Sequence, residues 1–187
     1  LGRARHTGDM TITPGIHEIG PDQGDLRLHT TCRGAMARMG HDLTLGVDTW
    51  RAKLDAGETV DACALRVTAD LTTLRVVSSS GGAKPTTEED HEQIIANAAD
   101  SLGVATHPQL TYVSTSIGGT WDAGRVDGQL TLHGTTAPQS FDVRADGDAH
   151  VLTGTITQSH FGIKPFSAMM GALKLADEVA VEVRVVL

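Results

Sequence analysis

The stretch Gly128-Gln-Leu-Thr-Leu-His-Gly-Thr-Thr-Ala-Pro138 decides the fold of this chain. Within it, Leu130 and Leu132 alternate with polar residues, a period of two that is typical of a half-buried strand. We expect the Gly-Thr-Thr-Ala-Pro segment to be a tight connection, followed by a returning strand from Ser140 to Val143. A second alternating stretch, His107-Pro-Gln-Leu-Thr-Tyr-Val-Ser-Thr-Ser-Ile117, precedes it and predicts another strand.

The same alternation predicts strands along most of the chain. From Asp25 onward, Leu26, Leu28, Thr30 and Cys32 share one face. In a strand over 42–54 the inward face changes parity, which a bulge near Asp48-Thr49 would explain. The predicted strands cover residues 15–19, 25–33, 42–54, 60–71, 110–117, 125–133, 140–145, 150–158 and 178–187.

One helix interrupts the strands. Thr86 with Glu89 three residues later has the spacing of a capping box, and acidic residues follow in the first turn. We therefore predict a helix over residues 87–102, after a loop over 78–85. Ile94, Ile95, Ala98 and Leu102 would share its apolar face and cover one end of the sheet.

Five separated motifs resemble those of the YceI-like family in the family's order. They are the two stretches quoted above, Gly40-His-Asp-Leu-Thr-Leu45 leading to Trp50, Phe161-Gly-Ile163, and Asp177-Glu-Val179. The resemblance implies an all-β fold with one inserted helix, an extended antiparallel lipocalin-like β-barrel of about eight strands. It also implies binding of polyisoprenoids and pairing into a homodimer. The barrel domain would span residues 14–187, after a tail or arm over 1–13.

Composition narrows the function further. A net charge of −8 argues against nucleic acid, which is bound through clustered Lys and Arg. The chain contains no run of 18 apolar residues, so no transmembrane helix is predicted. We expect a cytoplasmic protein, or a periplasmic or secreted one if a signal peptide has been removed upstream. With two Trp, one Tyr and three Phe in 187 residues, a barrel of this size can keep room for a ligand.

The ligand-binding hypothesis rests on apolar residues in a long crossover, 159–174, which is too long for a hairpin turn. Methionine adapts to irregular ligands, and Lys, Arg or His at a mouth could meet a polar head group. Lys84 and Arg38 are further head-group candidates. The predicted ligand-binding residues are Met36, Met39, His41, Leu65, Val67, Leu132, Phe161, Ile163, Lys164, Phe166, Met169 and Met170.

The leading hypothesis is a soluble carrier of an isoprenoid, a prenyl-quinone or another long-chain lipid, with no cofactor and no metal. An enzyme acting on a small hydrophobic substrate, with His41, His133 or His160 as acid or base, is the alternative. A structural module with a filled interior is a third. No histidine or cysteine spacing matches a metal site. Cys32 and Cys63 are predicted to lie in strands as buried thiols, although one disulfide is conceivable.

Overall fold

The hairpin at the heart of the chain turns at His133 and Gly134. Both residues have positive φ, 54° and 72°, as a two-residue turn between twisted antiparallel strands requires. The turn joins β9 (Ala123–Leu132) to β10 (Thr135–Asp146) in the computed structural model, which describes residues 11–187. The predicted tail over 1–13 therefore lies mostly outside the described residues.

The predicted connection over 134–138 is wrong, because β10 already begins at Thr135. Thr135 pairs with Leu132, and Pro138 pairs with Gln129. Pro138 is tolerated in this strand because β11 (Ala149–Thr157) pairs with β10 only from Asp142 onward. At Pro138 the strand thus has a neighbour on one side only, where a missing N–H costs no ladder hydrogen bond.

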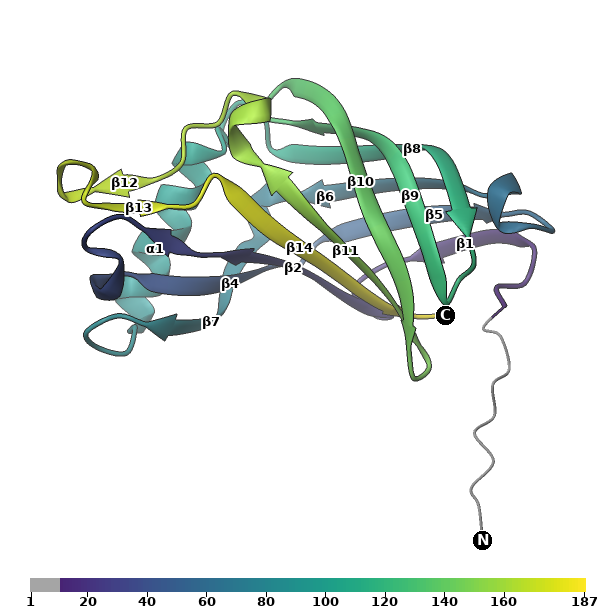
Figure 1. Cartoon of the computed structure of the whole chain (residues 1–187), viewed down its shortest axis with the longest axis horizontal. Helices are drawn as coiled ribbons and strands as arrows, with labels where there is room; N and C mark the ends of the chain where they lie inside the picture. Colours follow the sequence, from purple (N-terminus) through teal and green to yellow (C-terminus); the bar gives the residue numbers. More distant parts are fainter. Residues whose placement is uncertain (1–10) are drawn as a thin grey trace, which may run out of the picture.

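Eleven antiparallel strands form one sheet that curls on itself (Figure 1). The class predicted from the sequence, an all-β barrel-like fold with one α-helix, is confirmed, although the strand number exceeds the expected eight. The order across the sheet is β1-β5-β6-β8-β9-β10-β11-β14-β2-β4-β7. The remaining bounds are β1 Gly15–Ile19, β2 Gly24–Thr30, β4 His41–Val47, β5 Trp50–Ala56, β6 Ala64–Asp70, β7 Leu74–Gly81, β8 Gln109–Gly119 and β14 Glu178–Val186.

One extra strand arises where a continuous stretch of chain changes partners, and β7 is a strand that the sequence did not predict. The predicted strand over 42–54 is two strands, since β4 pairs with β2 and β7 whereas β5 pairs with β1 and β6. Asp48 and Thr49 form the corner, and backbone hydrogen bonds join it to the corner between β6 and β7, from Asp48 N–H to the Thr73 carbonyl and from Asp70 N–H to the Thr49 carbonyl. The parity change is therefore a sheet corner and not a bulge.

The predicted strand over 60–71 is also shorter than expected. Its first residues form a 3₁₀ turn, η2 (Val60–Ala62), and its last one begins another, η3 (Leu71–Thr73). The predicted loop over 78–85 starts later, because β7 continues to Gly81.

The α-helix α1 (Glu88–Ser101) covers one end of the curled sheet, as predicted. Its capping box consists of Thr87 and Asp90, one residue later than the predicted pair Thr86 and Glu89. The reason is that the Thr86 hydroxyl is engaged elsewhere: it lies 2.7 Å from Ser79 Oγ of β7 and 2.9 Å from His91 Nε2. Thr86 thus ties α1 to β7, and Thr87 caps the helix.

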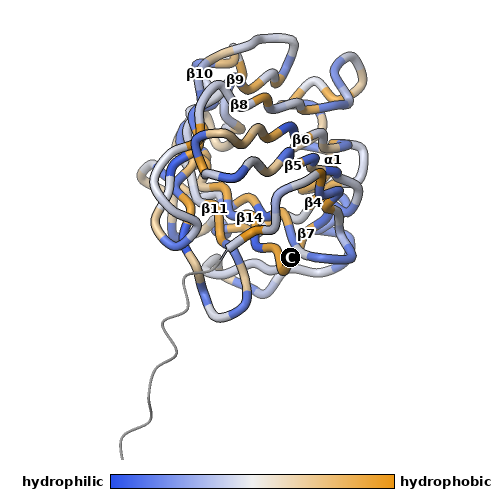
Figure 2. Tube along the Cα trace, turned by 90° about the vertical axis from the view of Figure 1, so that its right-hand side faces the viewer, coloured by the Kyte–Doolittle hydropathy of each residue, from blue (hydrophilic) through white to orange (hydrophobic). Residues whose placement is uncertain are grey.

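The inner face of the sheet carries the apolar residues that alternation predicted. Apolar and polar positions alternate along neighbouring strands (Figure 2). Tyr112, Val126 and Leu130 are almost completely buried. Gly128 permits the close approach of β8 and β9 here, because a Cβ at this position would lie 2.5 Å from the Val113 carbonyl oxygen and 2.6 Å from the Tyr112 hydroxyl.

A small second sheet forms a flap beside α1. It consists of β12 (Ser167–Ala168), β13 (Leu173–Leu175) and β3 (Cys32–Arg33), and the turn between β12 and β13 is η5 (Met169–Gly171). Arg33 lies directly opposite Lys174, and Cys32 lies opposite Leu175. Directly opposite residues project from the same face of a sheet. The flap therefore has an outer face with Arg33 and Lys174 and an inner face with Cys32 and Leu175.

Candidate functional site

Two cavities follow one another inside the curled sheet. The first, called here the helix-end chamber, has a volume of about 290 Å³ and lies between the sheet, α1 and the flap. The second, called the far chamber, has a volume of about 120 Å³ and is lined by β-strands, Ile12 and the C-terminal residue Leu187. The inner faces of the strands thus surround a partly empty interior.

The two chambers share three wall residues, Leu28 of β2, Leu110 of β8 and Ile156 of β11. These residues form the waist of the interior. Ile156 is 6 % exposed, so its side chain is packed in the wall. Because the same side chains border both chambers, a ligand that passes the waist would occupy both of them.

The wall of the helix-end chamber is apolar apart from a few polar groups. Ile94, Ala98 and Leu102 contribute the apolar face of α1, as the sequence predicted. Met39 and Lys174 are exposed and also line the chamber, so the chamber reaches the surface between η1 (Ala37–Met39) and the flap. We call this opening the mouth.

Two buried polar side chains, Thr30 and Gln158, lie in the wall of the helix-end chamber. Gln158 Nε2 donates a hydrogen bond to the Ala176 carbonyl at 3.0 Å. The Thr30 hydroxyl has no hydrogen-bond partner among the described residues. Thr30 can therefore offer one hydrogen bond to a neutral polar group of a ligand.

Cys32 and His41 lie close together near the mouth. The Cys32 thiol donates to the His41 carbonyl at 3.2 Å. Burial, and secondarily the Asp42 carboxylate, raise the pKa of this thiol, which keeps it protonated and weakly reactive. The His41 ring places Nε2 2.7 Å from the Lys84 carbonyl oxygen. Cys32 and Cys63 are both free thiols, so the conceivable disulfide does not form.

The far chamber is more strongly apolar: no polar atom of its wall is exposed to it. The Tyr112 hydroxyl points away into the sheet and donates to the Gln139 carbonyl at 3.0 Å. Burial, with a smaller contribution from Asp127, raises the pKa of this hydroxyl, so it remains neutral. His150 is 6 % exposed and lines the same chamber. This part of the interior is suited to hydrocarbon.

Seven of the twelve predicted ligand-binding residues lie in the chamber walls. Met39, His41, Leu132, Ile163 and Phe166 line the helix-end chamber, and Leu65 and Val67 line the far chamber. Alternation also indicated Leu110 and Ile156 as inward residues and put Leu28 on one face with Thr30, but it did not predict that the three form a waist or that Gln158 is buried. No local pattern identifies Gln158, because the residues to which it donates hydrogen bonds, Ala176 and Asp177, lie far away in the sequence.

Five predicted residues lie elsewhere. Phe161 is packed in the core, and Met36 is half-buried on the short loop before η1. Lys164 is exposed, Met169 is 53 % exposed, and the Met170 side chain is fully exposed. The expectation of a methionine wall is therefore wrong for the pair in the crossover: the β12–β13 turn directs both side chains to solvent.

The histidines considered as acid or base do not converge. His133 faces His107, with ring centroids 5.9 Å apart, and its Nδ1 lies 3.2 Å from the Phe161 carbonyl oxygen. His160 is exposed, and of the three only His41 lines a chamber. Among the described residues, the His41 ring is at hydrogen-bond distance from a backbone carbonyl and forms no ion pair with a carboxylate. Within residues 11–187 no group of three or more metal-binding side chains forms, and none of the helices is long and apolar enough to cross a membrane.

The comparisons with known proteins agree with this architecture. The family model for the YceI-like domain matches residues 23–187. None of the curated proteins compared with the chain matches it.

Solved structures with a similar fold include proteins from two bacteria. BcnA from Burkholderia cenocepacia is 17 % identical, with a TM-score of 0.56 over 85 % of this chain and 94 % of that one. The YceI protein of Campylobacter jejuni is 15 % identical, with a TM-score of 0.53 over 75 % and 81 %. A mutant of that protein with a monobromobimane guest is 16 % identical, with a TM-score of 0.54 over the same shares. At these identities the likeness shows the fold alone.

Proposed function

The chain belongs to the YceI-like family of β-barrel binding proteins, and we propose that it carries one long apolar lipid chain, such as an isoprenoid or a prenyl-quinone, inside the sheet. The observation that carries this proposal is the pair of chambers that meet at Leu28, Leu110 and Ile156. A linear ligand would extend from the mouth through the waist into the far chamber. The absence of polar surface in the far chamber favours a hydrocarbon tail over a polar substrate.

The energetics suit such a ligand. Each buried CH₂ group contributes about 0.8 kcal/mol, so a chain of roughly forty carbons would contribute about 30 kcal/mol before costs. Non-covalent affinities saturate near about 18–21 kcal/mol, and ordering a flexible chain costs several kcal/mol more. Enclosure of only part of the tail is therefore enough for tight binding, and the remainder can lie at the mouth.

The polar groups of the helix-end chamber could bind the head group of the lipid. Within residues 11–187 the buried Thr30 hydroxyl has no hydrogen-bond partner, while His41 and Lys174 lie nearer the mouth. A hydroxyl or carbonyl head group would bond to Thr30, and an anionic one would stay near Lys174. A lipid bound in this way would enter and leave between η1 and the flap.

The test is extraction of the purified protein with organic solvent, together with native mass spectrometry. We expect a co-purifying lipid with a long apolar chain, and we expect delipidated protein to take up a prenyl alcohol or a prenyl-quinone. Protein that is recovered empty and does not bind prenyl lipids, prenyl-quinones or fatty acids would rule the proposal out. Self-association into a homodimer stays a prediction from the family, and light scattering tests it.

A further inference from the structure

Methionine side chains project from the mouth into solvent. Met170 is fully exposed, and Met169 and Met39 are 53 % and 50 % exposed. Met169 and Met170 both have left-handed backbone, with φ of 52° and 57°, a conformation that costs a residue with a Cβ of the order of 1 kcal/mol or more. The turn thus maintains an unfavourable conformation that keeps an apolar side chain in water.

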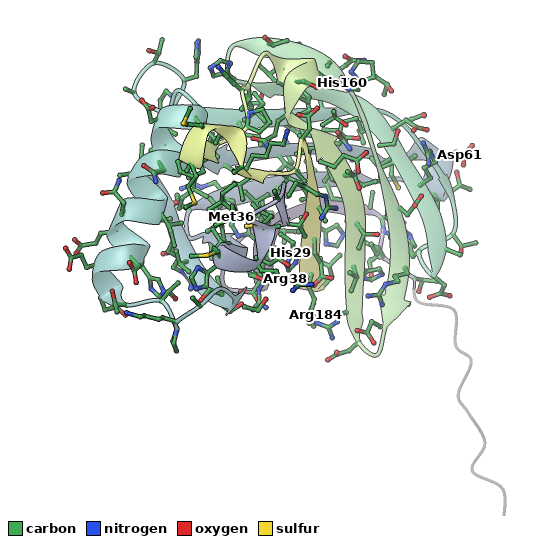
Figure 3. The ribbon with its side chains drawn as sticks, turned by 60° about the vertical axis from the view of Figure 1, so that its left-hand side comes forward. His29, Met36, Arg38, Asp61, His160 and Arg184 are labelled. Atoms are coloured by element: carbon green, nitrogen blue, oxygen red, sulfur yellow. The ribbon has the colours of Figure 1, made fainter. Side chains whose placement is uncertain are left out.

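The methionines are held together by contacts between the flap and the loop before η1. The Met36 N–H donates to the Ala172 carbonyl at 2.8 Å, which joins the two segments. Gly34 allows this contact, because a Cβ there would lie 2.5 Å from the Ala172 oxygen. Figure 3 shows Met36 and Arg38 on this side of the molecule, beside α1 and away from Asp61. We call the group Met39, Met169 and Met170 the methionine rim.

Four exposed basic side chains lie on the flap, on η1 and on the segment before β12. Arg33 and Lys174 lie opposite each other on the outer face of the flap, and Arg38 and Lys164 are exposed on the adjoining segments. Within residues 11–187, none of the four has a carboxylate at ion-pair distance. On the barrel wall, Arg27, Arg75, Arg125, Arg144 and Arg184 form ion pairs with Asp, whereas Arg51, Lys53 and Arg66 form none among the described residues. The charges at the mouth are therefore free to meet a partner.

Asp42 and the acidic first turn of α1 are engaged or set apart from the mouth, whereas Glu92 and Asp100 of α1 are exposed. Asp42 accepts a hydrogen bond from the Cys32 N–H at 2.7 Å. Glu88, Glu89 and Asp90 lie in the first turn of α1, which is tied to β7, whereas the chamber is lined by later residues of the helix. Exposed basic side chains of the flap thus lie next to the apolar tip in a chain whose net charge is −8.

We propose that this end of the protein docks on an anionic lipid bilayer, with Met170 in the acyl-chain boundary and Arg33, Arg38, Lys164 and Lys174 among the head groups. Shallow apolar insertion combined with basic residues is how proteins bind such surfaces, and each Lys or Arg contributes to the attraction. Met39 and Lys174 belong both to this surface and to the wall of the helix-end chamber. Docking would therefore open the mouth directly onto the membrane, and this last step rests on the proposed lipid-carrier function.

Co-sedimentation with vesicles tests the docking. We expect the full chain to bind vesicles that contain phosphatidylserine or phosphatidylglycerol, to bind pure phosphatidylcholine vesicles at least tenfold more weakly, and to lose affinity at 1 M salt. Arg33→Gln combined with Lys174→Gln should weaken binding to the anionic vesicles by about thirtyfold, from the attraction of two basic residues. Met170→Ser should weaken it by about tenfold, because one apolar side chain no longer inserts.

Matched controls separate this surface from general effects of charge and hydrophobicity. Ile16→Ser removes an apolar side chain that is 61 % exposed on β1, and Arg51→Gln with Lys53→Gln removes two exposed charges from β5. These controls should bind the vesicles like the wild type. In addition, a Met170→Trp variant should show a blue-shifted emission that brominated lipids quench, and Ile16→Trp should not.

The outcomes distinguish docking from lipid carriage. Docking is overturned if the wild type does not bind anionic vesicles, if it binds neutral ones equally well, or if the control variants lose as much affinity as the rim variants. If the protein contains lipid but does not bind vesicles, the carrier proposal stands and the docking proposal is overturned. If the protein binds anionic vesicles but takes up no lipid, the docking proposal stands and the carrier proposal is overturned.

Discussion

The rings of Trp121 and His150 form a T-shaped pair, with ring centroids 6.0 Å apart and an interplanar angle of 83°. Neither ring nitrogen of His150 has a hydrogen-bond partner among the described residues. Burial lowers the pKa of His150, and Asp122 opposes this only in part. His150 is thus a neutral imidazole built into an apolar wall.

This arrangement predicts a loss of stability at mildly acidic pH. In the unfolded chain a histidine binds a proton below about pH 6.5, whereas folded His150 resists protonation to lower pH. The contribution of neutral His150 to folding stability is therefore fully present above about pH 6.5, and it declines as the pH falls below this value. We expect the urea midpoint to fall between pH 7.5 and 5.5, and a His150→Leu variant to show a smaller fall. Equal slopes for the wild type and the His150→Leu variant would contradict the prediction.

The hydrogen bond of Tyr112 predicts a measurable contribution to stability. Tyr112→Phe removes the donor to the Gln139 carbonyl and leaves this oxygen without that partner in a tightly packed part of the sheet. We expect the free energy of unfolding to fall by about 1–2 kcal/mol. The control is Thr115→Val, which removes an exposed hydrogen bond to the Asp127 carbonyl and should change stability by less than about 0.5 kcal/mol. If denaturation showed that both variants lose the same free energy of unfolding, the buried hydrogen bond of Tyr112 would stabilise the fold no more than the exposed one of Thr115.

The waist predicts a dependence on ligand length. Ile156→Phe places a larger side chain between the chambers, so a long chain can no longer reach the far chamber. Loss of only two buried CH₂ groups weakens affinity by more than about tenfold. We expect this loss in calorimetric titrations with long prenyl lipids, and little change with chains of about ten carbons, which fit at the mouth. Thr155→Phe, one residue away and exposed, is the control. If the variant bound both lengths like the wild type, the two chambers would not form one binding site.

The position of the capping box predicts which residue stabilises α1. Thr87→Ala removes the oxygen that accepts the Asp90 N–H and should destabilise the helix by about 1 kcal/mol. Glu89→Ala, at the position favoured by sequence alone, should change stability by less than about 0.5 kcal/mol. Amide hydrogen exchange along α1 measures both effects. Faster exchange in the Glu89 variant than in the Thr87 variant would place the cap at Thr86 after all.

Sequence patterns predicted much of the fold and part of the site. Alternation correctly identified inward residues such as Leu65, Val67 and Leu132, because a strand directs every second side chain to the same face. The crossover around Met169 and Met170 was interpreted incorrectly as a cavity wall. Its composition is that of a wall, but hydrophobicity does not indicate the direction in which a turn with positive φ points its side chains.

Periodicity along the chain was thus sufficient for the β-class, the covering helix and an apolar interior, since these depend on neighbouring residues and on the burial of one face. The corner at Asp48 and Thr49, the waist of Leu28, Leu110 and Ile156, and the methionine rim were decided in three dimensions. Each depends on which strands become partners and on which segments meet from distant parts of the chain. Such pairings are set by the global curl of the sheet, whose energy is spread over many contacts and leaves no pattern in any single stretch.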